Sequence, residues 1–121
     1  MKMTKRLLVA FATLTVLIGC GPSSSSEKTM LTANAIIIDV RTPAEYAEGH
    51  VEGSINLDLE SGQFEAELPN LDPAQPYIVY CRSGRRSGVA LEIMKASGFT
   101  QITDYQTLEN AANKTGLPII E

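Results

Sequence analysis

The sequence predicts a single α/β domain built on an open, mainly parallel sheet with helices on both faces. Two observations lead to this prediction. Strand-like segments alternate along the chain with segments of helical periodicity, and two of the strand-like segments, Ala35–Val40 and Pro76–Cys81, are almost continuously apolar. Continuous apolar runs are typical of strands covered on both faces, and strand–helix alternation is typical of parallel sheets. With 121 residues, the chain has room for one such domain.

Four segments alternate in the first half of the domain. Ala35–Val40 is β-branched throughout its centre and is expected to be the first strand. Thr42–Gly49 opens with a residue that can cap a helix, continues with proline at the first helical position and ends with glycine. Ser54–Leu59 alternates apolar and polar residues and is expected to be a second strand. Gly62–Leu71 has apolar residues at helical spacing and is interrupted by a proline.

The second half continues the alternation. Pro76–Cys81 is expected to be a buried strand, and Arg85–Gly98 a helix that ends at its glycine. Thr100–Asp104 is expected to be a short strand, and Tyr105–Lys114 a final helix. The helix at Arg85–Gly98 is expected to bury one face, formed by Val89, Ala90, Ile93 and Met94.

The N-terminal part of the chain is expected to lie outside the domain. Lys2, Lys5 and Arg6 precede an apolar run at Leu7–Gly19, which has the length of a signal-peptide core and is shorter than the roughly 20 residues of a transmembrane helix. The run ends in "LIGC", which resembles the lipobox of bacterial lipoproteins. This resemblance implies cleavage before Cys20 and acylation of its sulfur, for example with palmitate. An ordinary secretory signal with a chance cysteine is the alternative.

These features predict three parts and a location. Residues 1–19 are expected to be a cleaved signal peptide, residues 20–33 a lipidated cysteine and a Ser-rich tether, and residues 34–121 the domain. The protein is then exported and lipid-anchored at the periplasmic face of a bacterial membrane. Cleavage leaves 102 residues with seven basic and 14 acidic side chains. This acidic balance argues against nucleic acid as a partner, and an acidic single domain favours a monomer.

The segment "YCRSGRRSG" at Tyr80–Gly88 carries the candidate chemistry. Cys81 ends the expected strand and a helix begins within a few residues, so the loop lies where sites form in parallel sheets. Small residues in this loop allow successive backbone N–H groups to turn toward one anion, and arginines beside a thiol favour its thiolate. We therefore expect Cys81 to be a nucleophile. A buried and inert cysteine is the alternative.

Two motifs together resemble the rhodanese domain, in particular its small, single-domain, exported sulfurtransferases. They are "IIDVRTPAEYAEGHVEGSINL" at Ile37–Leu57 and "YIVYCRSGRRSG" at Tyr77–Gly88. The resemblance extends over residues 35–104 and implies a rhodanese-like α/β fold. It also implies that Cys81 takes a sulfur atom from thiosulfate or a similar donor as a persulfide and passes it to cyanide or a thiol. No cofactor is implied.

The resemblance also implies the loop's roles. The substrate-binding cradle comprises Arg82, Ser83, Gly84, Arg85, Arg86 and Ser87. Arg86 is expected to aim its charge at the bound anion, whereas Arg82 and Arg85 face solvent and raise the local potential. Related phosphatases and arsenate reductases have a longer Cys-x5-Arg loop. Here Arg86 lies five positions after Cys81, which favours a single sulfur atom over a phosphate.

Other functions stay open from the sequence alone. The chain could be a non-catalytic persulfide carrier or anion-binding module for a protein partner, or a thiol redox sensor that lacks a resolving cysteine. The lone histidine, His50, is expected to pack and to hydrogen-bond backbone, and Asp39 with Arg41 to form a structural pair. One His and one available Cys give no basis for a metal site.

The sequence departs from the family pattern in one place. After the strand at Thr100–Asp104, relatives usually have a glycine pair, whereas "YQTLEN" at Tyr105–Asn110 follows here. Tyr105 is therefore expected to lie beside the pocket mouth, which leaves the identity of the sulfur acceptor open.

Overall fold

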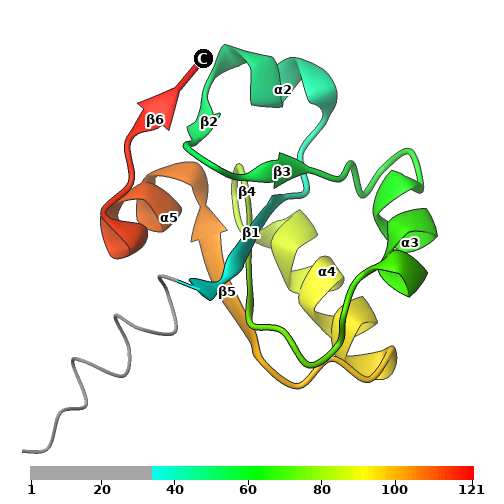
Figure 1. The fold of residues 1–121 in the computed structure, drawn as a ribbon. Coiled ribbons are helices and arrows are strands. Elements are labelled where there is room, and N and C mark those ends of the chain that lie inside the picture. The colour runs from blue at the N-terminus through cyan, green and yellow to red at the C-terminus, as the bar shows by residue number, and fades with distance from the viewer. Residues whose placement is uncertain (1–33) are drawn as a thin grey trace, which may run out of the picture.

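The structure is a computed structural model that describes residues 34–121 (Figure 1). The expected signal peptide at residues 1–19, the lipidation site Cys20 and the tether therefore lie outside the described residues. Within residues 34–121, no helix is long and apolar enough to cross a membrane. The elements in chain order are β1 (Ile36–Asp39), α2 (Pro43–Glu48), β2 (His50–Val51), β3 (Ile55–Asn56), α3 (Gln63–Glu67), the 3-10 helix η1 (Leu68–Asn70), β4 (Tyr77–Cys81), α4 (Arg85–Ala96), β5 (Ile102–Thr107), α5 (Leu108–Thr115) and β6 (Ile119–Ile120).

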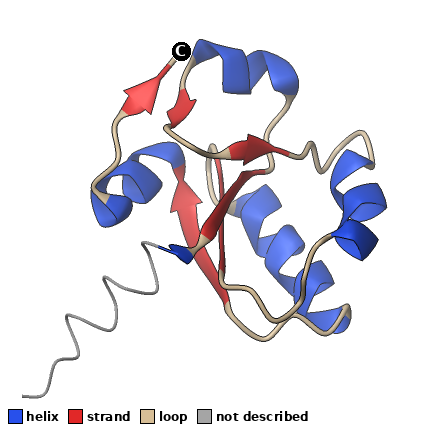
Figure 2. Cartoon of the chain, viewed as in Figure 1, coloured by secondary structure: helices blue, strands red, loops and turns tan. Residues whose placement is uncertain are grey.

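Four parallel strands in the order β3-β1-β4-β5 form the central sheet, as predicted (Figure 2). β1 and β4 occupy its centre and are buried because helices cover both faces, which explains their uninterrupted apolar sequences. The short strands β2 and β6 pair antiparallel in a separate two-stranded sheet. The predicted fold class is therefore confirmed.

Neighbouring residues of β1 and β4 point to opposite faces and build two apolar cores. On one face, Ile38 and Val79 pack with side chains of α3, η1 and α4, including Phe64 and Met94. On the other face, Ile37 and Ile78 belong to a smaller core that also includes residues of β2 and α5. The sheet is thus packed on both faces. Cys81 is the last residue of β4, so it lies in a fixed position at the carboxyl edge of the sheet.

Local sequence signals explain α2 in detail. The Thr42 side chain accepts a hydrogen bond from Glu45 N at 3.3 Å, and Glu45 Oε1 accepts from Thr42 N, which together form a capping box. Pro43 occupies the first helical turn, and the Gly49 N–H closes the helix on Tyr46 O. The predicted cap, first residue and end of this helix are confirmed.

Some predicted boundaries were wrong. β3 comprises two residues, whereas six were expected, because only Ile55 and Asn56 pair with β1. The predicted interruption of Gly62–Leu71 at its proline is confirmed, because α3 ends at Glu67 and Pro69 lies in η1. Val89 does not belong to the buried face of α4, because the residue is 47% exposed.

The last strand differs most from the prediction. β5 continues to Thr107, because Gln106 and Thr107 pair with Tyr80 and Cys81 after a bulge, and α5 begins at Leu108. Tyr105 is consequently a strand residue buried in the smaller core, not a residue of the pocket mouth. The side chain of Gln106 lies beside the loop in its place.

Candidate active site

The loop after β4 connects Cys81 to the first turn of α4. Gly84 caps α4 in the left-handed conformation, with φ of 94°. A Cβ at this position would lie 3.1 Å from Cβ of Gln106, so a larger residue would be strained by its backbone and crowded by its neighbour. The glycine thus permits the tight turn that brings N–H groups of the loop toward the Cys81 sulfur.

The Cys81 sulfur lies in a set of hydrogen-bond donors. The Gly84 N–H donates to Sγ at 3.0 Å, and the Ser87 hydroxyl oxygen lies 3.5 Å from it. Burial raises the pKa of this thiol, but hydrogen bonds from the Ser87 side chain and from the N–H groups of Ser87, Gly84 and Ser83 more than offset this effect, and the net pKa is lowered. The loop therefore favours a thiolate at Cys81.

The neutral thiol has different partners. Its S–H can donate to Gln106 O, which lies 3.4 Å from Sγ, while the Ser87 hydroxyl donates to Gly84 O at 3.1 Å. When the proton leaves, the Ser87 O–H can rotate toward the anion. Cys81 as a whole is completely buried, so a reactant reaches the sulfur only by way of the residues that surround it.

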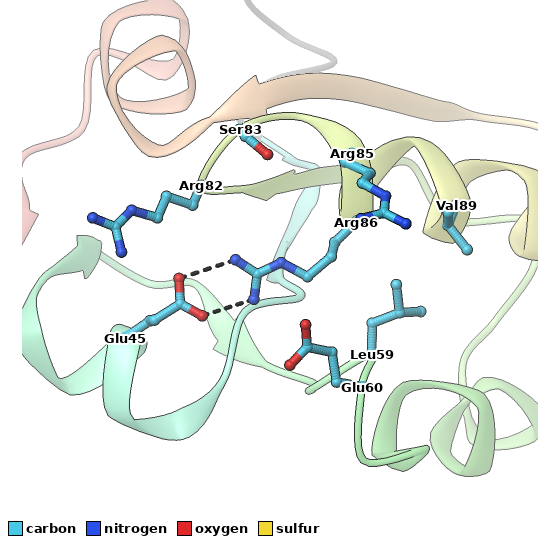
Figure 3. Close-up of a pocket in the computed structure, with 8 residues that line it drawn as sticks. All are labelled: Glu45, Leu59, Glu60, Arg82, Ser83, Arg85, Arg86 and Val89. Carbon is cyan, nitrogen blue, oxygen red and sulfur yellow. Dashed lines mark hydrogen bonds and ion pairs between the residues drawn. The ribbon is translucent and has the colours of Figure 1, made fainter.

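The three arginines are not equivalent. Arg82 and Arg85 are exposed, which confirms their predicted orientation, and their side chains diverge on either side of Arg86 (Figure 3). Arg86 instead forms a bidentate ion pair with Glu45 of α2, with N–O distances of 2.7 and 3.0 Å. The hydrogen bonds from Arg86 hold the pKa of Glu45 at about 2.

This ion pair qualifies the expected role of Arg86. The sequence predicts a guanidinium aimed at a bound anion, whereas the structure directs it at a carboxylate. The cavity of about 540 Å³ beside the loop therefore has a mixed-charge wall (Figure 3). Its lining comprises Glu45, Leu59, Glu60, Arg82, Ser83, Arg85, Arg86 and Val89. An anion entering this cavity meets Arg82 and Arg85 without a carboxylate bonded to them, since neither forms an ion pair within the described residues.

The remaining singled-out residues are structural, as predicted. His50 Nδ1 lies 2.8 Å from Tyr46 O and its ring stacks on Tyr46, so it contacts backbone and not Cys81. Asp39 and Arg41 form a buried pair at 2.7 Å, and Arg41 also donates to Gly49 O. Within residues 34–121, no group of three or more His, Cys, Asp or Glu side chains could hold a metal ion.

Sequence reasoning missed two residues of the site. The sequence predicts Glu45 only as a residue of α2, but α2 follows β1 at the same carboxyl edge of the sheet as the loop, and this topology is the signal for the contact. Gln106 lies where the glycine pair is replaced. The missing glycine pair is the sequence signal for this position. Because the strand was expected to end at Asp104, the sequence analysis named Tyr105 instead of Gln106.

Comparison with known proteins agrees with this geometry. A family described as "Rhodanese-like domain" matches residues 25–107. Thiosulfate sulfurtransferase PspE of Escherichia coli is 36% identical over 75 residues, which cover 62% of this chain and 72% of that protein. Thiosulfate:glutathione sulfurtransferase of Saccharomyces cerevisiae is 32% identical over 83 residues, which cover about 60% of each chain. The putative sulfur carrier protein YrkF of Bacillus subtilis is 35% identical over 66 residues, or 54% of this chain and 35% of that one.

Solved structures support the same fold. A structure described as rhodanese with anions from E. coli superposes with a TM-score of 0.59 at 32% identity, covering 72% of this chain and 98% of that one. The Rhodanese_3-like domain of the Alr3790 protein from Anabaena superposes with a TM-score of 0.62 at 21% identity, covering 72% of this chain and 99% of that one. The second likeness concerns the fold alone.

Proposed function

Because the chain belongs to the rhodanese-like domain family, we propose that it is a sulfurtransferase that carries sulfur on Cys81. Relatives named thiosulfate sulfurtransferases support sulfur transfer as the type of reaction. The observation that carries the proposal is the set of hydrogen-bond donors around the Cys81 sulfur, which favours an anion at that atom. Thiosulfate or a similar small anion is the proposed donor.

The proposed reaction has two steps. The Cys81 thiolate attacks the outer sulfur of thiosulfate, a new S–S bond forms to Cys81, and sulfite leaves with the electron pair of the old S–S bond. Cyanide or a thiolate then attacks the outer sulfur of the persulfide, and its product leaves while the Cys81 thiolate is restored. No general base is required, because both forms of Cys81 are anions.

The loop can stabilise both anions in this sequence. The N–H groups of Ser83, Gly84 and Ser87 lower the pKa of the thiol, and the same groups are positioned to bind negative charge that develops near the sulfur. Arg82 and Arg85 raise the local concentration of anionic donors at the cavity. Arg86 is bonded to Glu45, so we propose that it contributes to the shape of the cavity as well as to its potential.

A persulfide-carrier function is the second candidate. The similarity to the putative sulfur carrier protein YrkF and the complete burial of Cys81 favour it, since a buried persulfide is protected from unselective acceptors. Slow turnover with small acceptors but fast transfer to a protein would support the carrier.

Intact mass spectrometry tests the proposal directly. The full chain with Cys20→Ser contains Cys81 as its one thiol. We expect thiosulfate to add the mass of one sulfur atom, and cyanide to remove it with formation of thiocyanate. The same chain with Cys81→Ser should show neither change. Thiocyanate formation that persists in the Cys81→Ser chain would refute a Cys81 persulfide.

We also propose that the protein is an exported lipoprotein anchored through Cys20. The basic start, the short apolar run and the cysteine at its end support this assignment. Acyl chains at Cys20 and the Ser-rich tether would hold the domain near the periplasmic face of the membrane, where small donors reach its cavity.

A further inference from the structure

Gln106 has an unusual backbone. It is the one non-glycine residue among residues 34–121 with a positive φ, at 70°. Its N–H donates to Asp104 Oδ1 at 2.8 Å, which helps to hold this conformation at the bulge of β5. A residue with a side chain is strained in the left-handed region, whereas glycine is not. Gln106 therefore has a side chain at a backbone position that glycine would adopt without strain.

Gln106 forms the β5 side of the Cys81 environment. Its carbonyl oxygen lies 3.4 Å from Cys81 Sγ and 3.5 Å from the Ser87 hydroxyl. Its Cβ and Cγ lie 3.1 and 3.5 Å from the point where a Cβ on Gly84 would stand, so they pack closely over the glycine. Gln106 itself is exposed, so the residue whose carbonyl oxygen contacts the sulfur also faces solvent.

The cavity lined by Arg82, Arg85 and Arg86, here called the arginine cavity, lies elsewhere around the same loop. Its lining includes Ser83 and Arg86 but neither Gln106 nor Cys81. The loop around the sulfur therefore borders two different surfaces. One is the cavity with its mixed-charge wall, and the other is closed by Gln106 packed against Gly84.

From this arrangement we propose that Gln106 is a specificity-determining residue that closes the β5 side of Cys81 to bulky reactants. Attack on the sulfur is then restricted to molecules that enter through the arginine cavity. As a statement about sulfur acceptors, the inference rests on the proposed function. The inference that Gln106 limits access to the Cys81 thiol does not depend on that function. Access and sulfur transfer are therefore measured separately.

Thiol alkylation measures access independently of sulfur transfer. In the full chain with Cys20→Ser, the rate of Cys81 modification by iodoacetamide is compared with that by an iodoacetamide carrying a naphthalene ring. We expect Gln106→Gly to raise the ratio of the bulky to the small reagent about tenfold, the scale of a lost steric barrier in a pocket. Gln106→Ala retains Cβ and should give an intermediate ratio, and it also serves if the glycine variant does not fold.

Gly98→Gln is a control for a change in backbone strain: it adds left-handed strain away from the loop, whereas Gln106→Gly removes it beside the loop. Gly98 has φ of 91° and no atom lies within 4 Å of a Cβ placed there, so this variant adds a left-handed glutamine far from the loop. Its alkylation ratio should equal that of the parent chain. An unchanged ratio in folded Gln106→Gly, or an equal rise in Gly98→Gln, would overturn the inference.

Kinetics with different sulfur acceptors test whether Gln106 also affects sulfur transfer. With thiosulfate as donor, Gln106→Gly should raise kcat/KM for glutathione relative to kcat/KM for cyanide, since cyanide is small enough for either approach. A role of Gln106 in folding alone would change both constants by the same factor, and that result would count against the inference. If the parent chain forms no persulfide, the proposed function fails, while the alkylation ratio still decides whether Gln106 controls access.

Discussion

Replacing Glu45 by glutamine would remove one charge beside the loop and leave the local helix cap able to form. Glu45 Oε1 accepts from both N and Oγ1 of Thr42, and glutamine suits the same capping-box position. The bidentate ion pair to Arg86 would be lost. The variant therefore separates the charge of Glu45 from its role in starting α2.

The magnitude follows from the pKa of Glu45. A fall from the ordinary value of 4.5 to about 2 corresponds to roughly 3 kcal/mol of interaction with the ionised form. The two side chains are 18% and 19% exposed, so water screens part of this interaction. We expect Glu45→Gln to lower the free energy of unfolding at neutral pH by about 1–2 kcal/mol.

The loss should depend on pH in a defined direction. The pKa of Glu45 is lower in the folded than in the unfolded chain, so its contribution is fully present above about 4.5 and disappears as the pH falls toward 2. Urea denaturation of the parent chain and the Glu45→Gln chain, both with Cys20→Ser, measures this. The two stability curves should converge as the pH falls from about 5 to 2.

Two variants control the interpretation. Combining Glu45→Gln with Arg86→Gln should give a destabilisation smaller than the sum of the single changes, by about 1 kcal/mol, if the two side chains interact as the structure indicates. Thr42→Ala removes the cap, including the hydrogen bond from Thr42 Oγ1 to Glu45, and leaves the ion pair, so only part of its cost should disappear at low pH. A Glu45→Gln deficit that is the same at neutral and low pH, with no coupling to Arg86, would refute the reasoning.

Three further predictions follow from single contacts. Ser87→Ala should raise the pKa of Cys81, because a hydroxyl that favours the thiolate is lost; the pH dependence of Cys81 alkylation measures it, and an unmoved midpoint would contradict it. Tyr80→Phe should cost about 1–3 kcal/mol of stability in urea denaturation, since the buried Val51 N–H loses its acceptor at 3.1 Å; a neutral effect would mean that another acceptor takes its place. Cys20→Ala should move the protein from the membrane fraction to the soluble fraction, and continued membrane association would argue against the lipoprotein assignment.

The predictions that succeeded rest on local patterns. The capping box and Pro43 define where α2 begins through contacts between residues three apart, which are visible in any stretch of sequence. Continuous apolar runs identified β1 and β4 because both are covered on two faces. The position of Cys81 at the end of a strand and before a helix then located the site at the carboxyl edge of the sheet.

The predictions that failed depend on pairing between distant segments. β3 is short because only two of its residues pair with β1, and β5 is long because it continues past its bulge along β4 to Thr107. The extent of pairing with the neighbouring strand cannot be predicted from the residues of β3 or β5 alone. The same error placed Tyr105 at the pocket mouth, because a residue expected to begin the final helix lies within the strand, where its side chain packs in the smaller core.

The sequence by itself determined the order of the central strands and their helices, though not the short strands β2 and β6, together with the fold class and a cysteine loop that presents N–H groups and arginines. These follow from interactions within a few residues, so composition and spacing are sufficient to predict them. The tertiary structure decided which charge each arginine meets and which residue covers the sulfur. Arg86 selects Glu45 across 41 positions, and Gln106 reaches Cys81 across 25. Each of these contacts depends on distance in space and on competition among polar groups. Both conditions exist only once the sheet has assembled and brought the distant segments together.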